Sequence, residues 1–170
     1  MKMAEMSLEL IKTLRTRTSA GVMDCKRALE AAGGDLAKAE ELLKQKGIAL
    51  AGKRAARDVL QGVVECYIHA GSRVGAMVEL NCETDFVART EEFKELAHNL
   101  AMQVAAMAPR YVDSGDVPPG HTVNPEEVCL LEQPFIKDQS RTVRELVSEL
   151  VGRMGENVRV RRFERFALGE

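Results

Sequence analysis

The hydrophobic positions in the first 47 residues recur every three or four residues, the spacing of amphipathic helices. Breaks rich in glycine and small polar residues divide this stretch into three short segments. We therefore predict a three-helix bundle with a thin core, a unit that suits docking because it lacks the volume for a catalytic cleft. Its apolar stripes are Leu8, Ile11 and Leu14, then Val22, Met23, Ala28, Leu29 and Ala32, then Leu36, Ala39, Leu42 and Leu43.

Capping residues predict where these helices begin and end. Ser19 and Asp35 are the expected N-caps of the second and third helices, because a short polar side chain can accept a hydrogen bond from a free backbone N–H. The pair Gly33 and Gly34 ends the second helix. Gly47 stands where a C′ glycine would end the third.

From Gln61 the hydrophobic period changes from helical to two. Residues 62–69 and 73–80 alternate around a short turn at 70–72, which predicts a β-hairpin. The last segment, 158–168, predicts a third strand, and the short apolar run 128–131 is compatible with a further strand.

Two longer amphipathic helices are predicted at 91–107 and 143–154, the second closed by Gly155. A polar loop rich in proline and glycine spans 110–127. Strands with segregated helices indicate the α+β class, here a small antiparallel sheet covered by helices. We divide the chain into an N-terminal docking module at 1–47, a linker at 48–60 that is helical in part, and an α+β core domain at 61–170.

Composition narrows the function. The chain has 170 residues, with 24 Lys and Arg against 26 Asp and Glu, a net charge of −2. Nucleic-acid binding by the whole chain would need a clear positive excess, so we expect no direct nucleic-acid partner. No apolar run has the length of a membrane helix, and the start MKMAEMSLEL lacks the pattern of a signal peptide. We expect a cytoplasmic protein with no membrane partner.

Candidate chemistry is sparse. Cys25, Cys66, Cys82 and Cys129 show no CxxC spacing and are expected to be buried free thiols. The sequence has no glycine-rich phosphate loop, HExxH motif or legible nucleophile and base. We expect no metal, no cofactor and no bond-making catalysis.

One aromatic residue stands out of pattern. Phe86 lies in the polar stretch 81–89, between the end of a strand and the helix at 91–107, where Thr84 or Asp85 could cap a helical turn. Phe86 could pack back on the long helix as a hydrophobic staple. Alternatively, it could be an exposed aromatic anchor on a rigid corner, the geometry of an interface hot spot.

The segment TDFVAR at 84–89 resembles the signature of the elongation factor Ts family. Four further segments carry the same resemblance, in the same order along nearly the whole chain. They are 11–29 (IKTLRTRTSAGVMDCKRAL), 78–83 (VELNCE), 132–138 (EQPFIKD) and 155–163 (GENVRVRRF).

The resemblance implies a translation elongation factor that promotes exchange of GDP for GTP on elongation factor Tu by protein–protein contact. The N-terminal module would resemble a ubiquitin-associated domain and dock on the partner's GTP-binding domain. Its matching contact positions are Arg15, Val22 and Met23. The matching wedge, directed at the partner's magnesium and phosphate site, is Thr84, Asp85, Phe86 and Val87.

The chain resembles the short type of this family, with room for one core, and the resemblance therefore implies a homodimer in which two cores act together. The segment between Pro109 and Glu127 looks shortened against that type. The competing hypothesis is a binding module without exchange activity, in which the bundle binds a peptide or a ubiquitin-like partner and the core only dimerises.

Overall fold

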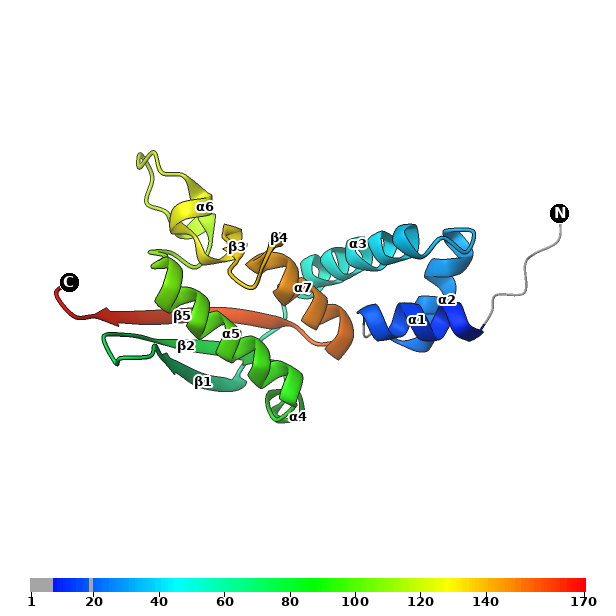
Figure 1. The fold of residues 1–170 in the computed structure, drawn as a ribbon, viewed down its shortest axis with the longest axis horizontal. Coiled ribbons are helices and arrows are strands. Elements are labelled where there is room, and N and C mark those ends of the chain that lie inside the picture. Colours follow the sequence, from blue (N-terminus) through cyan, green and yellow to red (C-terminus); the bar gives the residue numbers. More distant parts are fainter. Residues whose placement is uncertain (1–7, 19) are drawn as a thin grey trace.

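The computed structural model describes residues 8–18 and 20–170 and confirms the α+β class. A helical bundle forms one end of the molecule, and a sheet with its covering helices forms the other (Figure 1). The elements in chain order are α1 (Leu8–Thr18), α2 (Val22–Ala31), α3 (Leu36–Arg54), β1 (Gln61–Ile68), β2 (Val74–Cys82), α4 (Asp85–Ala88), α5 (Glu91–Met107), η1 (Ser114–Asp116), α6 (Pro125–Val128), η2 (Leu130–Glu132), β3 (Pro134–Phe135), β4 (Asp138–Thr142), α7 (Val143–Met154) and β5 (Val158–Ala167).

The N-terminal bundle has a core of its own, in which Leu14, Cys25, Leu29 and Ala39 are fully buried. Asp35 caps α3 as predicted, because its carboxylate accepts a hydrogen bond from the Lys38 backbone N–H at 3.1 Å. Helix α2 begins after Gly21. The predicted N-cap Ser19 lies outside the described residues.

The predicted end of α3 is wrong. Gly47 does not end this helix, which continues through the first half of the stretch predicted as a linker and ends at Arg54. The physical reason is packing, because Gly47 is buried against the backbone of α7. That tertiary contact outweighs the local preference for glycine just past a helix end.

Helices α3 and α7 cross at two glycines. A Cβ atom on Gly152 would lie 3.3 Å from the Cα of Gly47, and one on Gly47 would lie 3.4 Å from the Ser148 carbonyl oxygen. Glycines let the two backbones approach closely, and Figure 1 shows α3 running beside α7. The ion pair between Lys44 and Glu145, at 2.9 Å, adds a polar contact to the crossing. The crossing joins the bundle to the core.

The predicted hairpin is confirmed. Strands β1 and β2 pair antiparallel, β5 pairs antiparallel with β2, and the sheet order is β1-β2-β5. Helix α5 has the predicted bounds and covers one face of this sheet (Figure 1). Its Phe93 and Leu100 are buried with Val78 and Leu80 of β2 in the main core.

The segment after α5 differs from the prediction. Residues 128–131 form no strand of a sheet; they contribute the end of α6 and the start of η2, with a single bridge between Tyr111 and Cys129. A short β3–β4 pair, absent from the prediction, follows. Buried Gln103 of α5 explains this arrangement, because it donates to the Pro134 carbonyl at 3.1 Å and accepts from the Ile136 N–H at 2.9 Å.

Three of the four thiols are buried as predicted, and one is not. Cys66 is exposed because its strand, β1, turns this side chain toward the sheet face opposite α5. Burial raises the pKa of the Cys82 thiol to about 11, which leaves it protonated and unreactive at neutral pH. Within the described part of the chain, no helix combines the length and apolar character needed to span a membrane.

The glycine crossing predicts a contrast between two substitutions in α3. Gly47→Leu should lower the unfolding free energy by about 1–3 kcal/mol, because a side chain there overpacks the contact with α7. Gly52→Leu in the same helix should leave stability unchanged or raise it by up to about 1 kcal/mol, since nothing lies within 4 Å of the added Cβ. Urea unfolding measures both, and equal effects would contradict the role of the crossing.

Candidate partner-binding site

Two threonines shape the corner between β2 and α5, because each is the N-cap of one of the two helices that follow β2. Thr84 is the N-cap of the single turn α4, and its hydroxyl accepts from the Val87 N–H at 3.5 Å. Thr90 is the N-cap of α5, where its hydroxyl accepts from the Phe93 N–H at 3.3 Å. The chain therefore changes direction twice within a few residues, with the backbone groups of both turns hydrogen-bonded.

The turn α4 buries one side and exposes the other. Val87 is 8% exposed and packs with Ala88 in the main core. Phe86, one helical step earlier, points away from that core and is 80% exposed. The staple hypothesis required Phe86 to pack on α5, and the exposed ring excludes it. Of the two alternatives from the sequence, the geometry matches an exposed aromatic residue on a rigid corner.

The remaining corner residues differ in accessibility. Asp85 is half-buried, and its carboxylate pairs with Arg89 at 2.8 Å in an exposed ion pair. Pairs of this kind contribute little to stability, so Asp85 can exchange partners at small cost. The Thr84 hydroxyl is already hydrogen-bonded as the N-cap of α4. Val87 is buried and offers little surface to a partner. Asp85 and Phe86 are therefore the outward pair among the four predicted wedge residues.

Two carboxylates hold the corner from behind. Glu156 accepts from the Thr84 N–H at 3.0 Å and from the Thr84 hydroxyl at 2.6 Å. Glu83 accepts from the Asn157 N–H at 2.6 Å and pairs with Arg57 at 3.3 Å. The hydrogen bond from Asn157, supported by Arg57, holds the pKa of the Glu83 carboxyl below its usual range. Glu83 is therefore ionised at neutral pH.

The sequence analysis did not predict the hydrogen bonds that Glu83 and Glu156 make at this corner. Glu83 and Glu156 both lie within segments that carried the family resemblance, 78–83 and 155–163, but no local pattern links Glu156 to Thr84, which is 72 residues away. Only the antiparallel pairing of β2 with β5, in which Cys82 lies opposite Val158, brings the two segments together. The only local signal for this role was the position of Glu156, just before the predicted strand 158–168.

The predicted contact positions of the bundle form a second exposed site. Met23 is 60% exposed, and Arg15 and Val22 are also exposed. Val22 and Met23 begin α2, and Arg15 lies on α1. These residues belong to the bundle end of the molecule, whereas α4 lies on the core (Figure 1). The structure therefore keeps the two predicted contact sites apart.

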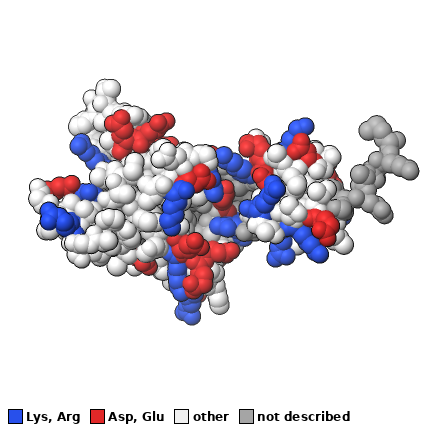
Figure 2. All heavy atoms as spheres, viewed as in Figure 1, with Lys and Arg blue, Asp and Glu red and all other residues white. Residues whose placement is uncertain are grey.

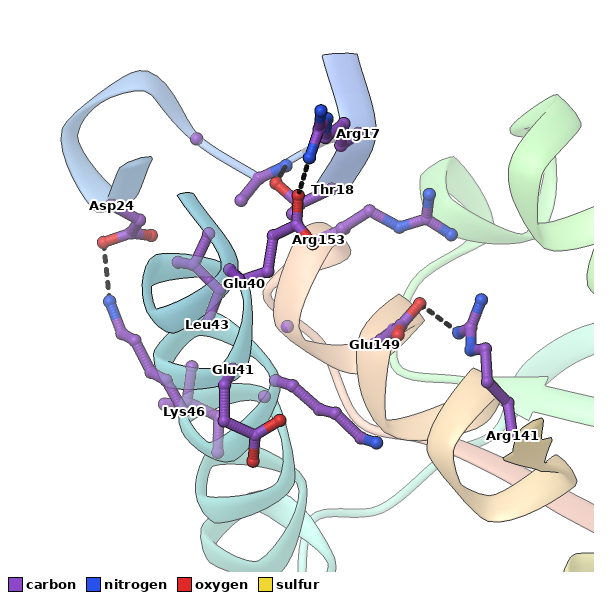
Figure 3. Close-up of a pocket in the computed structure, with 17 residues that line it drawn as sticks. Arg17, Thr18, Asp24, Glu40, Glu41, Leu43, Lys46, Arg141, Glu149 and Arg153 are labelled. Carbon is purple, nitrogen blue, oxygen red and sulfur yellow. Dashed lines mark hydrogen bonds and ion pairs between the residues drawn. The ribbon is translucent and has the colours of Figure 1, made fainter. Parts of the chain in front are cut away.

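A cavity of about 440 Å³ lies between the bundle, including α3, and the end of β4 with α7. Several of its charged side chains are paired with one another, as Figure 3 shows for Asp24 with Lys46 at 2.6 Å and Arg17 with Glu40 at 3.0 Å. Arg141 and Glu149 pair in the same way. Hydrogen bonding to Lys46 lowers the pKa of the Asp24 carboxyl. These pairings indicate a polar junction between the two parts rather than a reactive site.

Charge does not gather into one field on the face shown in Figure 2, where positive and negative side chains are interspersed. Among residues 8–18 and 20–170, no group of three or more His, Cys, Asp or Glu side chains could hold a metal ion. The exposed apolar side chains are therefore the candidate contacts for a partner protein.

Comparison with known proteins agrees with the resemblance found in the sequence. Residues 37–125 match the family model "Elongation factor TS". The chain is 49% identical to elongation factor Ts of Carboxydothermus hydrogenoformans over 192 residues, covering 95% of this chain and 88% of that protein. It is 47% identical to elongation factor Ts of Thermotoga neapolitana over 194 residues, covering 98% of each.

Both alignments are longer than the 170 residues of this chain, so each relative carries residues with no counterpart here. The shortened segment predicted between Pro109 and Glu127 would require a difference of this kind. The identity and the coverage are high enough to assign the family. The chain belongs to the elongation factor Ts family.

Proposed function

We propose that this chain promotes the exchange of GDP for GTP on elongation factor Tu by protein–protein contact. Family membership supports the partner and the process. The observation that carries the mechanism is Phe86, an aromatic ring 80% exposed on a corner whose backbone is fixed from behind. Nucleotide exchange needs no bond-making chemistry, so we propose an exchange factor rather than an enzyme, acting in the cytoplasm as a translation factor.

The proposed wedge consists of Asp85 and Phe86, held by Thr84 and Val87. Asp85 and the ring would reach the magnesium and phosphate site of the partner, and the ring would enter a pocket between partner side chains. Burying a phenylalanine side chain contributes about 1.5–3 kcal/mol. If the pocket opens only when the magnesium and phosphate ligands have shifted, this free energy opposes nucleotide binding.

The coupling must act in both directions. Each ~1.4 kcal/mol of coupling weakens GDP binding about tenfold, and returning nucleotide weakens binding of the factor by the same ratio. An effective exchange factor therefore binds the nucleotide-free partner best and dissociates when nucleotide returns. A ring that is solvent-exposed in the free factor suits reversible binding, because entering the pocket breaks no contact within the factor.

We propose that the bundle, residues 1–47, docks on the GTP-binding domain through Arg15, Val22 and Met23. Two adjacent apolar side chains that remain in water are typical of a contact surface. The segment 48–60 connects this module to the core domain, 61–170, and its first half, 48–54, is the end of α3. Docking and wedging are thus assigned to different parts of the chain.

The open face of the sheet supports a homodimer. Val64, Ile68, Met77 and Phe166 all point away from α5 and are exposed. Ile68, Gly75 and Phe166 are aligned in the register and form an apolar row across the three strands, while Met77 lies in the next row beside Glu164. We propose that a second copy of the chain covers this face. We expect neither a membrane nor a nucleic acid as direct partner.

Phe86→Ala should reduce the maximal rate of GDP release from elongation factor Tu about tenfold or more, because the free energy of burying the ring is lost. The stability of the factor should change by no more than about 0.5 kcal/mol, since the ring is exposed. Release of a fluorescent GDP analogue measures the rate. Met107→Ala, which truncates an exposed side chain at the opposite end of α5 from the corner, is the control.

If Phe86→Ala released GDP as fast as the unmodified chain, the wedge assignment would be wrong. If the unmodified chain bound elongation factor Tu without accelerating release, the exchange function itself would be refuted and a docking module would remain.

Met23→Glu should separate docking from exchange. A carboxylate in the proposed apolar contact should raise the half-saturating concentration of the factor about tenfold or more, because the charge must be desolvated. The maximal rate of GDP release should stay the same. Ile48→Glu, at a comparably exposed position on α3, should change neither value. A fall in the maximal rate with unchanged half-saturation would contradict this division of roles.

Phe166→Glu should convert the homodimer into a monomer by placing a charge in the apolar row. Sedimentation equilibrium should give a mass near twice 18.7 kDa for the unmodified chain and near 18.7 kDa for the variant. Met107→Glu, at an exposed position on α5 on the other side of the sheet, should remain dimeric. A monomeric unmodified chain would refute the proposed role of this face.

A further inference from the structure

The proposed wedge depends on a residue far from it in the sequence. The Glu156 carboxylate lies between Gly155, which closes α7, and the start of β5. One of its oxygens accepts from the Thr84 backbone N–H at 3.0 Å, and the other accepts from the Thr84 hydroxyl at 2.6 Å. Both oxygens of one carboxylate are thus used on one residue, the N-cap of the turn that presents Phe86.

The neighbouring residues repeat this contact in the opposite direction. Glu83, just before Thr84, accepts from the backbone N–H of Asn157, just after Glu156, at 2.6 Å. Each of the two segments therefore gives a carboxylate to the backbone of the other. Hydrogen bonds to ionised acceptors are shorter and stronger than neutral ones. This reciprocal pair joins the start of α4 to the start of β5.

The turn α4 needs this support. A helix of four residues is too short to be stable on its own, so its geometry comes from its attachments. Val87 and Ala88 attach its inner side to the core. Glu156 attaches its first residue. Phe86 is exposed and contributes little packing, so the direction of its ring follows from the backbone that these attachments hold.

We propose that Glu156 is a positioning residue for nucleotide exchange: it holds Thr84 so that the Phe86 ring is aligned before the partner arrives. The inference rests on the proposed exchange function and extends it to a residue that need not touch the partner. Glu156 acts through the rigidity of α4. Without the Glu156 carboxylate, α4 becomes more mobile in the free protein. The turn must then be ordered when the partner binds, which lowers the rate of GDP release.

The principal test measures GDP release from elongation factor Tu with Glu156→Ala, Glu156→Gln and Glu156→Ala combined with Phe86→Ala. Glu156→Ala should lower the maximal rate about tenfold, the factor expected for lost charged hydrogen bonds, with half-saturation changed less than about threefold. Glu156→Gln should be intermediate, because its carbonyl oxygen can still accept from the Thr84 N–H. In the double variant, loss of Glu156 should add nothing to the loss of Phe86.

A purely structural role predicts a different pattern. Asp116→Ala is the matched control, because the Asp116 carboxylate also accepts from the backbone N–H of an N-cap residue, Asp113 of η1, at 3.0 Å. It should lower stability without lowering the maximal rate of the folded protein. Multiplicative losses in the double variant, or equal losses for Asp116→Ala and Glu156→Ala, would overturn the positioning role.

A second readout needs no partner and separates this inference from the exchange function. Amide hydrogen exchange of residues 84–88 should accelerate in Glu156→Ala and Glu156→Gln, while residues 93–104 of α5 keep their protection. Unchanged exchange at 84–88 would overturn the inference whatever elongation factor Tu does. Failure of the unmodified chain to release GDP, with faster amide exchange in the variants, would instead refute the proposed function and leave the structural part of the inference standing.

Discussion

Burial of Val87 and Ala88 in the core fixes how the chain presents Phe86. Successive helical residues are rotated by about 100°, so when these two side chains face the core, the preceding one must face water. Because the Phe86 ring is exposed, it contributes little to the stability of the fold. Its position is maintained by its neighbours: two apolar residues on the inner side of α4 and the Thr84 cap that Glu156 holds. The structure thus keeps apolar area in water, available for a contact with another protein.

The second requirement is a fixed relation between the two proposed contact sites. The bundle carries Val22 and Met23, and the core carries Phe86. They are joined through α3, whose crossing with α7 at Gly47 and Gly152 brings the two backbones into contact. A close crossing of long helices transmits orientation better than a flexible linker. The ion pairs that line the cavity beside this crossing add polar contacts of small individual strength.

Much of this fold could be predicted from local signals. Helices α5 and α7 and the β1–β2 hairpin follow from hydrophobic period and capping residues. The errors arise where tertiary contacts decide. Gly47 has the local features of a helix end but lies in a helix–helix contact, and 128–131 is apolar because Leu130 is buried, not because it forms a strand. The sequence placed Phe86 at a corner but could not choose between staple and anchor, because the choice depends on which neighbours are buried. The contact of Glu156 could not be predicted for the same reason, since its partner Thr84 is 72 residues away.

The central claim is that the free energy of contact at Phe86 is coupled against the free energy of GDP binding. The most direct measurement is the affinity of this chain for elongation factor Tu in its nucleotide-free form and in its GDP-bound form, determined by calorimetry under one set of conditions. The account predicts tighter binding to the nucleotide-free form, by the same factor by which the chain weakens GDP binding. Equal affinity for the two forms would contradict it, because a protein that does not distinguish two states cannot shift the equilibrium between them.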